Sequence, residues 1–177
     1  MAGLRNQAGT AARALEFTIL TGARTSEATG ARWSEIDLDN AVWIVPDNRI
    51  KAEREHRVPL SGAVMNLLRD QAKYRDGEFV FPGGRAGRPL SNMAMTNVLK
   101  RMKIHGITVH GFRSCFRDWA AECTNHPREV AEMALAHAIG DKVEAAYRRG
   151  DLFEKRKQLM AEWAAYCDYI ERPAKVI

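Results

Sequence analysis

The fold class is decided by residues 33–60, which read WSEIDLDNAVWIVPDNRIKAEREHRVPL. Apolar residues stand in three short groups here, and Asp39-Asn40 and Pro46-Asp47-Asn48 separate them. Asp, Asn and Pro in such places are typical of turns. The stretch therefore predicts a small three-stranded antiparallel meander, whose second and third strands are joined around residues 51–55.

Helical periodicity dominates on both sides of this sheet. An apolar stripe from Ala8 to Ile19 stops at Gly22, and glycine is the residue type that most often ends a helix. Apolar residues spaced 4, 3 and 4 apart indicate an amphipathic helix over 112–123. A last helix over about 152–169 is expected either to pack into the core or to dock onto a neighbouring subunit. The residues expected to begin further helices are Ser61, Ser91 and Pro127. The fold class is thus mainly α (α+β), with one small antiparallel sheet.

Composition excludes several classes of protein. The chain has 177 residues, of which 46% are hydrophobic and 28% charged, a balance that argues against intrinsic disorder. No run of 18 apolar residues occurs and the N-terminus lacks an apolar signal region, so neither a membrane span nor secretion is expected. Three cysteines without a Cys-x-x-Cys motif fit a reducing, cytoplasmic compartment. The net charge of +5 permits a nucleic-acid partner without establishing one.

The common catalytic motifs are missing from the sequence. It contains no phosphate loop of the GxxxxGK[ST] type, no HExxH, no EF-hand loop and no GxSxG. Asp37 and Asp39 lie beside an expected strand turn, and turn formation explains them better than metal binding. We therefore expect no metal site and no ATP hydrolysis through a phosphate loop.

Five short stretches carry residues that are unusual on structural grounds. The residues are Arg24 and Glu27, Lys51, His110 and Arg113, His137, and Tyr147. Each has a plain explanation by itself: Arg24 can bind the carbonyls of a helix end, and Lys51 can be a solvated hairpin charge. His137 can equally be a buried histidine, and Tyr147 a packing residue. Their order in the chain is what suggests a shared site.

Taken together, these residues resemble the tyrosine recombinase (phage integrase) family, specifically the catalytic domain of a prophage-type integrase. The order matches: TG-x-R-x-x-E, a hairpin Lys before V-P-L, H-x-x-R, L-x-H, then a Tyr ten residues on. The resemblance covers about residues 15–166. It implies one catalytic domain over residues 1–177, with a core of about 10–170 and a loose tail at 171–177.

The resemblance implies an enzyme that cuts and rejoins DNA through a 3′-phosphotyrosyl intermediate, with Tyr147 as the nucleophile and no metal, ATP or other cofactor. Arg24 and Arg113 would stabilise the phosphate, since a guanidinium stays charged and presents paired donors. Lys51 is the candidate general acid for the 5′-oxygen. His110 is the favoured base and His137 a phosphate donor, although the two histidines can exchange these roles. Glu27 either holds Arg24 in place or is an exposed helix glutamate.

The expected partner is double-stranded DNA. Candidate phosphate contacts are Arg101, Lys103, Arg148 and Arg149, and residues 142–157 carry six basic side chains that could contribute. The resemblance implies a homotetramer on attachment sites for a full-length protein, a monomer for this chain alone, and accessory DNA-bending proteins as candidate partners. It also implies a cytoplasmic, nucleoid-associated bacterial protein that binds no membrane.

One departure from the family is the short segment before Arg24. Intact relatives carry helical core-binding and often arm-binding domains there, and these are absent here, so a catalytic fragment or gene remnant with weak, salt-sensitive DNA binding is expected. Two alternatives remain beside the integrase hypothesis. One is a type IB topoisomerase-like enzyme that nicks and reseals a strand, and the other is a DNA-binding remnant without catalysis.

Overall fold

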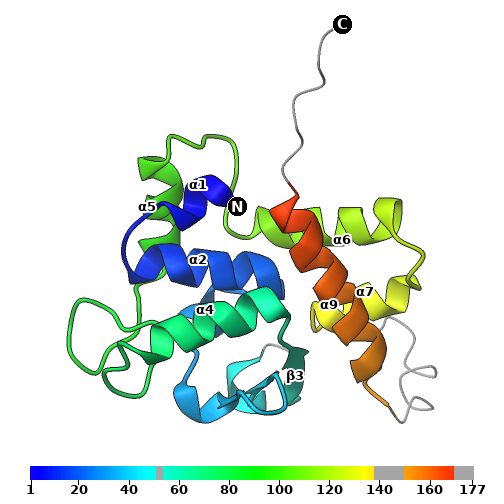
Figure 1. The fold of residues 1–177 in the computed structure, drawn as a ribbon, viewed down its shortest axis with the longest axis horizontal. Helices are drawn as coiled ribbons and strands as arrows, with labels where there is room; N and C mark the ends of the chain where they lie inside the picture. The colour runs from blue at the N-terminus through cyan, green and yellow to red at the C-terminus, as the bar shows by residue number, and fades with distance from the viewer. Residues whose placement is uncertain (51–53, 138–149, 170–177) are drawn as a thin grey trace, which may run out of the picture.

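The computed structural model describes residues 1–50, 54–137 and 150–169 (Figure 1). In chain order the helices and strands are α1 (Ala2–Arg5), α2 (Thr10–Thr21), α3 (Thr25–Thr29), η1 (Trp33–Glu35), β1 (Ile36–Asp37), β2 (Val42–Val45), η2 (Asp47–Arg49), β3 (His56–Pro59), α4 (Gly62–Ala72), α5 (Ala94–Arg101), α6 (Gly111–Cys123), α7 (Arg128–Ala134) and α9 (Phe153–Asp168). The predicted fold class, mainly helical with one small sheet, is confirmed.

The sheet is antiparallel with strand order β1-β2-β3, as predicted. Trp43 of β2 pairs with Val58 of β3, and both side chains are buried, whereas Ile44 between Trp43 and Val45 is partly exposed. This alternation gives the sheet one core face. The carboxylate of Asp37 accepts hydrogen bonds from the backbone of Asp39 and Asn40, so these residues form the turn that was expected.

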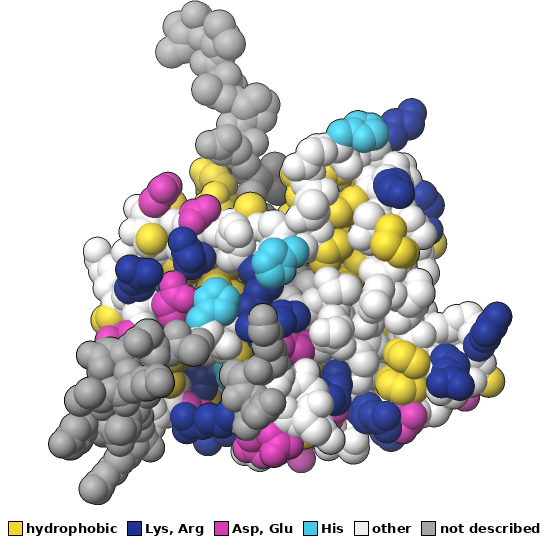
Figure 2. Space-filling model, turned by 180° about the vertical axis from the view of Figure 1, so that it is seen from behind, with side chains coloured by type: hydrophobic (Ala, Val, Ile, Leu, Met, Phe, Trp, Pro, Cys, Tyr) yellow, Lys and Arg dark blue, Asp and Glu magenta, His cyan; other side chains and the backbone are white. Residues whose placement is uncertain are grey.

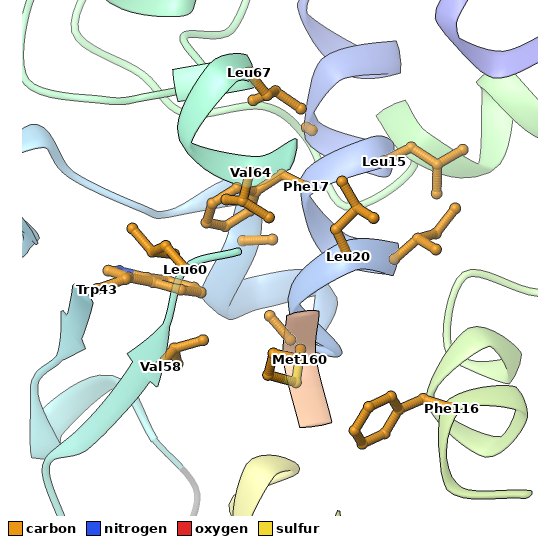
Figure 3. Close-up of a cluster of buried hydrophobic side chains, with 14 of the residues drawn as sticks. Leu15, Phe17, Leu20, Trp43, Val58, Leu60, Val64, Leu67, Phe116 and Met160 are labelled. Carbon is orange, nitrogen blue, oxygen red and sulfur yellow. The ribbon is translucent and has the colours of Figure 1, made fainter. Parts of the chain in front are cut away.

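Helix α2 is the centre of the molecule (Figure 1). It contacts α1, α3, α4, α5 and α9, and apolar residues around its whole circumference are buried. Phe17 lies with its ring centroid 5.0 Å from that of Trp43, which joins the helix to the sheet (Figure 3). Because α2 is buried on all sides, it holds the segment that follows its C-terminus, Gly22 to Arg24, in a fixed position.

Helix α2 ends where the sequence predicts. Gly22 is its C-cap, with φ of 63° in the left-handed region that favours glycine. A Cβ atom at this position would also lie 3.2 Å from Leu135 Cδ2. The glycine thus serves both the backbone turn and the close approach of the segment that follows α7.

Three other helix starts, and one position of an apolar stripe, differ in detail from the sequence predictions. Ser61 is the N-cap residue of α4, but its buried Oγ makes no hydrogen bond within the described structure. Helix α5 begins at Ala94 because Ser91 is part of a preceding turn. Pro127 caps α7 rather than occupying its first turn, and Cys123 at the end of α6 is exposed.

The C-terminal helix α9 packs into the core. Its buried residues include Met160 and Trp163, and it contacts α2, α4, α6, α7 and β3. The indole Nε1 of Trp163 donates to Ile19 O at 2.8 Å. Of the two roles considered for this helix, core packing is therefore the one that its described residues fill. No helix in the described ranges is both long and apolar enough to cross a membrane.

Candidate active site

Three side chains from distant parts of the chain meet where the ends of α2, α6 and α7 come together. Arg24 follows α2 and is the N-cap of α3, Arg113 lies in the first turn of α6, and His137 follows α7. Arg113 Nη2 lies 3.2 Å from His137 Nε2. The fold therefore places two guanidinium groups and one imidazole in one region.

Arg24 is oriented by Glu27, one turn further along α3. Glu27 Oε2 accepts the backbone N–H of Arg24 at 2.8 Å, and Oε1 accepts its Nη1 at 2.8 Å. Glu27 is only 5% exposed, so it is not the exposed helix glutamate considered as an alternative. The guanidinium of Arg24 is held from one side while part of it remains accessible to a ligand.

Arg113 is buried among backbone carbonyls. Its Nη1 donates to Gly22 O and its Nη2 to Leu135 O, the latter at 2.7 Å. Burial, and after it the charge of Arg24, lowers the pKa of Arg113 to about 10, while Glu27 opposes this shift. The group therefore stays charged at neutral pH. Its Nε is a buried donor without a hydrogen-bond partner in the described structure, and such a donor is suited to an anionic ligand.

His137 lies between the carboxylate of Glu132 and the guanidinium of Arg113. Its Nδ1 lies 2.6 Å from Glu132 Oε2, and its Nε2 faces Arg113. Because a guanidinium can only donate, Nε2 accepts in this arrangement and Nδ1 carries the hydrogen given to Glu132. Burial raises the pKa of Glu132, but the hydrogen bond to His137 and the nearby charges of Arg117 and Arg128 outweigh this and lower it overall.

The C-terminal end of α7 gathers these groups. Three consecutive carbonyls accept hydrogen bonds: Ala134 O from His56 Nε2 at 3.3 Å, Leu135 O from Arg113, and Ala136 O from Arg24 Nη2 at 3.4 Å. A helix C-terminus carries partial negative charge and unpaired carbonyls, so it attracts donors of this kind. The site is thus organised around the three backbone carbonyls at the end of α7, and the sequence alone does not show that they bind these side chains.

Sequence reasoning missed His56, the first residue of β3. Burial, followed by the charge of Arg156, lowers the pKa of His56 to about 4, so the ring is neutral near pH 7. Its place directly before the Arg57-Val58-Pro59-Leu60 stretch could have drawn attention to it. Its contact with α7, however, joins residues 78 positions apart, and no local sequence pattern predicts such a contact.

The other expected site residues divide into two groups. His110 is exposed at the N-cap of α6, and its ring makes no hydrogen bond to the Arg24, Arg113 and His137 cluster in the described structure. Lys51, Tyr147, Arg148 and Arg149 lie outside the described residues.

The expected DNA-contacting residues that are described lie at the surface. Arg101 and Lys103, at the end of α5, are exposed. Figure 2 shows histidine side chains beside Lys or Arg side chains near the middle of one face, with more basic side chains toward its edges. Arg156, counted among the basic side chains of residues 142–157, is an exception at 1% exposure. It bonds Asp151 and Arg57 O, so the expectation of a phosphate contact is wrong for this residue.

Comparisons with known proteins identify the family of the chain. The model of the phage integrase family matches residues 3–151. The prophage integrase IntA of Escherichia coli (strain K12) is 37% identical over 151 residues, covering 84% of this chain and 36% of that protein. The integrase of Enterobacteria phage P4 is 32% identical over 174 residues, covering 88% of this chain and 39% of the relative. The chain therefore spans roughly two fifths of the length of these curated relatives.

Solved structures share the fold. The lambda integrase (75–356) dimer bound to a COC′ core site superposes with a TM-score of 0.56 at 19% identity, over 84% of this chain and 55% of that one. The XerA recombinase gives a TM-score of 0.58 at 18% identity, over 84% and 62% of the two chains. At these identities the likeness concerns the fold.

Proposed function

The chain belongs to the phage integrase family, and from this we propose that it is the catalytic domain of a tyrosine-type site-specific DNA recombinase. The observation that carries the proposal is the meeting of Arg24, Arg113 and His137 at the end of α7. Two guanidinium groups and an imidazole held in fixed positions can bind a phosphodiester and stabilise the charge that develops on it during the reaction.

The proposed step exchanges one phosphate ester for another. The hydroxyl of Tyr147 attacks phosphorus, the Tyr Oη–P bond forms and the P–O5′ bond breaks. The phenol proton goes to His110, and the ammonium of Lys51 gives a proton to the departing 5′-oxygen. The products are a 3′-phosphotyrosyl bond and a free 5′-hydroxyl. One ester replaces another of similar energy, so the reverse reaction rejoins the strand.

Arg24 and Arg113 would stabilise the charge that develops on the non-bridging oxygens. The accessible part of Arg24 and the unpaired Nε of Arg113 are the donors available for this. Loss of one such donor from a site that excludes water costs roughly 3–4 kcal/mol of barrier. The carbonyls that already bind both groups keep them in place before DNA arrives.

His137 would contact the phosphate in its protonated form. In that form Nδ1 still donates to Glu132, and Nε2 gains a hydrogen to give to a phosphate oxygen. Glu132 Oε2 lies 2.6 Å from Nδ1 and fixes the orientation of the ring, so that Nε2 faces the region of the two arginines. Glu132 is therefore a positioning residue for this role.

Double-stranded attachment-site DNA is the proposed substrate, with Arg101 and Lys103 on its backbone. Exposed basic side chains bind phosphates in a salt-dependent manner, so affinity should fall steeply as salt rises. A tetramer of the full-length protein and accessory DNA-bending proteins belong to the same proposal. Membership of the integrase family does not favour the topoisomerase-like alternative.

The test is a duplex suicide substrate with a nick close to the scissile phosphate, which traps the covalent adduct. We expect an adduct with the unmodified chain and none with Tyr147→Phe. Tyr166→Phe, at an exposed tyrosine of α9, is the matched control and should retain the adduct. An adduct that survives Tyr147→Phe would refute the nucleophile assignment. Absence of any adduct from the unmodified chain would favour the inactive DNA-binding alternative.

A further inference from the structure

We propose that Arg49 and His56 are positioning residues that fix the two ends of the hairpin loop carrying Lys51. The inference rests on the proposed function, in which Lys51 protonates the leaving 5′-oxygen. Neither residue is expected to touch DNA. Each acts by tying one end of the loop to a helix that holds another member of the site.

Arg49 ties the first end of the loop to α3. Its Nη2 donates to Glu27 O at 2.7 Å, and its Nη1 pairs with Glu35 Oε1. Glu35 is fixed in turn by the indole Nε1 of Trp43 at 3.0 Å. A Cβ atom on Gly30 would lie 2.9 Å from Arg49 Nη2, so the absence of a side chain there leaves room for the guanidinium.

The residue between Arg49 and Lys51 is also fixed. Ile50 is 4% exposed and belongs to the core. Burial of Ile50 therefore fixes the point from which the chain continues toward Lys51. Lysine has a long flexible side chain, and limiting its backbone is the means available for limiting its reach.

His56 ties the other end of the loop to α7. Its Nε2 donates to Ala134 O at 3.3 Å, next to the Leu135 carbonyl that binds Arg113. The following residue is held as well, because the Arg57 carbonyl accepts a hydrogen bond from Arg156 Nη1 at 2.5 Å. The first residues of β3, which follow the loop, are therefore anchored to the end of α7 and to α9.

These contacts form two connections across the site. Glu27 binds Arg24 with its side chain and Arg49 with its carbonyl, so Arg24 and the start of the loop share one support. Ala134 and Leu135 link the end of the loop to Arg113 in the same way. Lys51 would thus be positioned relative to the phosphate by the two elements that position the arginines.

The experiment must separate loss of this positioning from a general loss of structure. It uses two suicide substrates of the same sequence, one with the normal 5′-oxygen at the scissile bond and one with sulfur in its place. A thiolate leaves with its electron pair and needs no proton, so the sulfur substrate does not require Lys51. The ratio of the two cleavage rates is independent of the fraction of protein that is folded.

The variants are Arg49→Lys and His56→Leu. Arg49→Lys keeps the charge but loses the planar paired donors that reach Glu27 O and Glu35, and His56→Leu removes the donor to Ala134. His56→Gln retains a donor and should behave nearly as the unmodified chain does. Arg69→Lys, at an exposed residue of α4, is the matched control, and Lys51→Ala is the reference for loss of the acid.

We expect Arg49→Lys and His56→Leu to cleave the oxygen substrate about tenfold or more slowly, and to raise the sulfur-to-oxygen rate ratio by a similar factor. An unchanged ratio in both variants, with a raised ratio in Lys51→Ala, would overturn the positioning role. An unchanged ratio in Lys51→Ala itself would instead overturn the proposed role of Lys51, and this inference with it.

Discussion

Replacement of Glu27 by glutamine tests how far the site depends on the orientation of Arg24. Glu27 is 5% exposed and accepts two hydrogen bonds from Arg24, each 2.8 Å long. Glutamine keeps one acceptor oxygen but places a neutral amide group opposite the other donor. Glu27→Gln therefore removes one charge-assisted hydrogen bond and leaves the rest of the contact in place.

The size of the effect follows from that single bond. A hydrogen bond between charged groups contributes about 1.5–3 kcal/mol. About 1.4 kcal/mol corresponds to a factor of ten in rate, so we expect cleavage to slow about 10- to 100-fold. The side chain of Arg24 is 24% exposed, so water can replace part of the lost contact and the free energy of unfolding should fall by only about 1–2 kcal/mol.

The assay is single-turnover formation of the covalent adduct on the nicked duplex, with urea unfolding measured in parallel. Glu122→Gln, at an exposed glutamate of α6, makes the same chemical change away from the site and should leave both quantities unaltered. If Glu27→Gln forms adduct within about twofold of the unmodified rate, the orientation of Arg24 by Glu27 has no catalytic role and the reasoning fails.

Three further predictions concern other buried polar groups. Arg113→Lys should lower the adduct-formation rate about 100-fold or more, because a compact ammonium cannot span the two carbonyls and a phosphate as the planar guanidinium does; an intact rate would contradict its role. Arg156→Met should lower the free energy of unfolding in urea by about 2–3 kcal/mol, since it removes the buried member of an ion pair whose Asp151 carboxylate is 35% exposed, while Arg69→Met changes it little; equal values would show that the pair contributes nothing. The pKa of His56 is lowered to about 4, below the 6.5 of an unfolded histidine, so its contribution to stability is complete above pH 6.5 and is lost as the pH falls toward 4. His56→Gln should make urea stability less dependent on pH in that window, and an unaltered profile would show that His56 does not titrate as inferred.

Several features were predictable because they depend on local chemistry. Alternating apolar residues and Asp, Asn and Pro turns are local features, and they are enough to predict the β1-β2-β3 meander. The end of α2 at Gly22 follows from the conformational freedom of glycine. The order of the motifs places Arg24, Arg113 and His137 in one predicted site, and these three residues meet at the end of α7.

Other features could not be inferred, because side-chain type does not report environment. Arg156 looks in the sequence like its basic neighbours Lys155 and Lys157, yet it is 1% exposed and binds Asp151. Glu27 could equally have been solvated. Its burial against Arg24 depends on how α3 packs beside α2.

Periodicity and turn residues act over a few positions, so they are enough to predict most of the helices, the small sheet and the chemical groups of the site. The gathering of His56, Arg113 and Arg24 on three successive carbonyls at the end of α7 depends instead on tertiary packing. The physical reason is that backbone acceptors are the same at every residue. The carbonyls of Ala134, Leu135 and Ala136 differ from others because they lie at a helix end, which leaves them without helical partners, and because packing brings distant donors within reach.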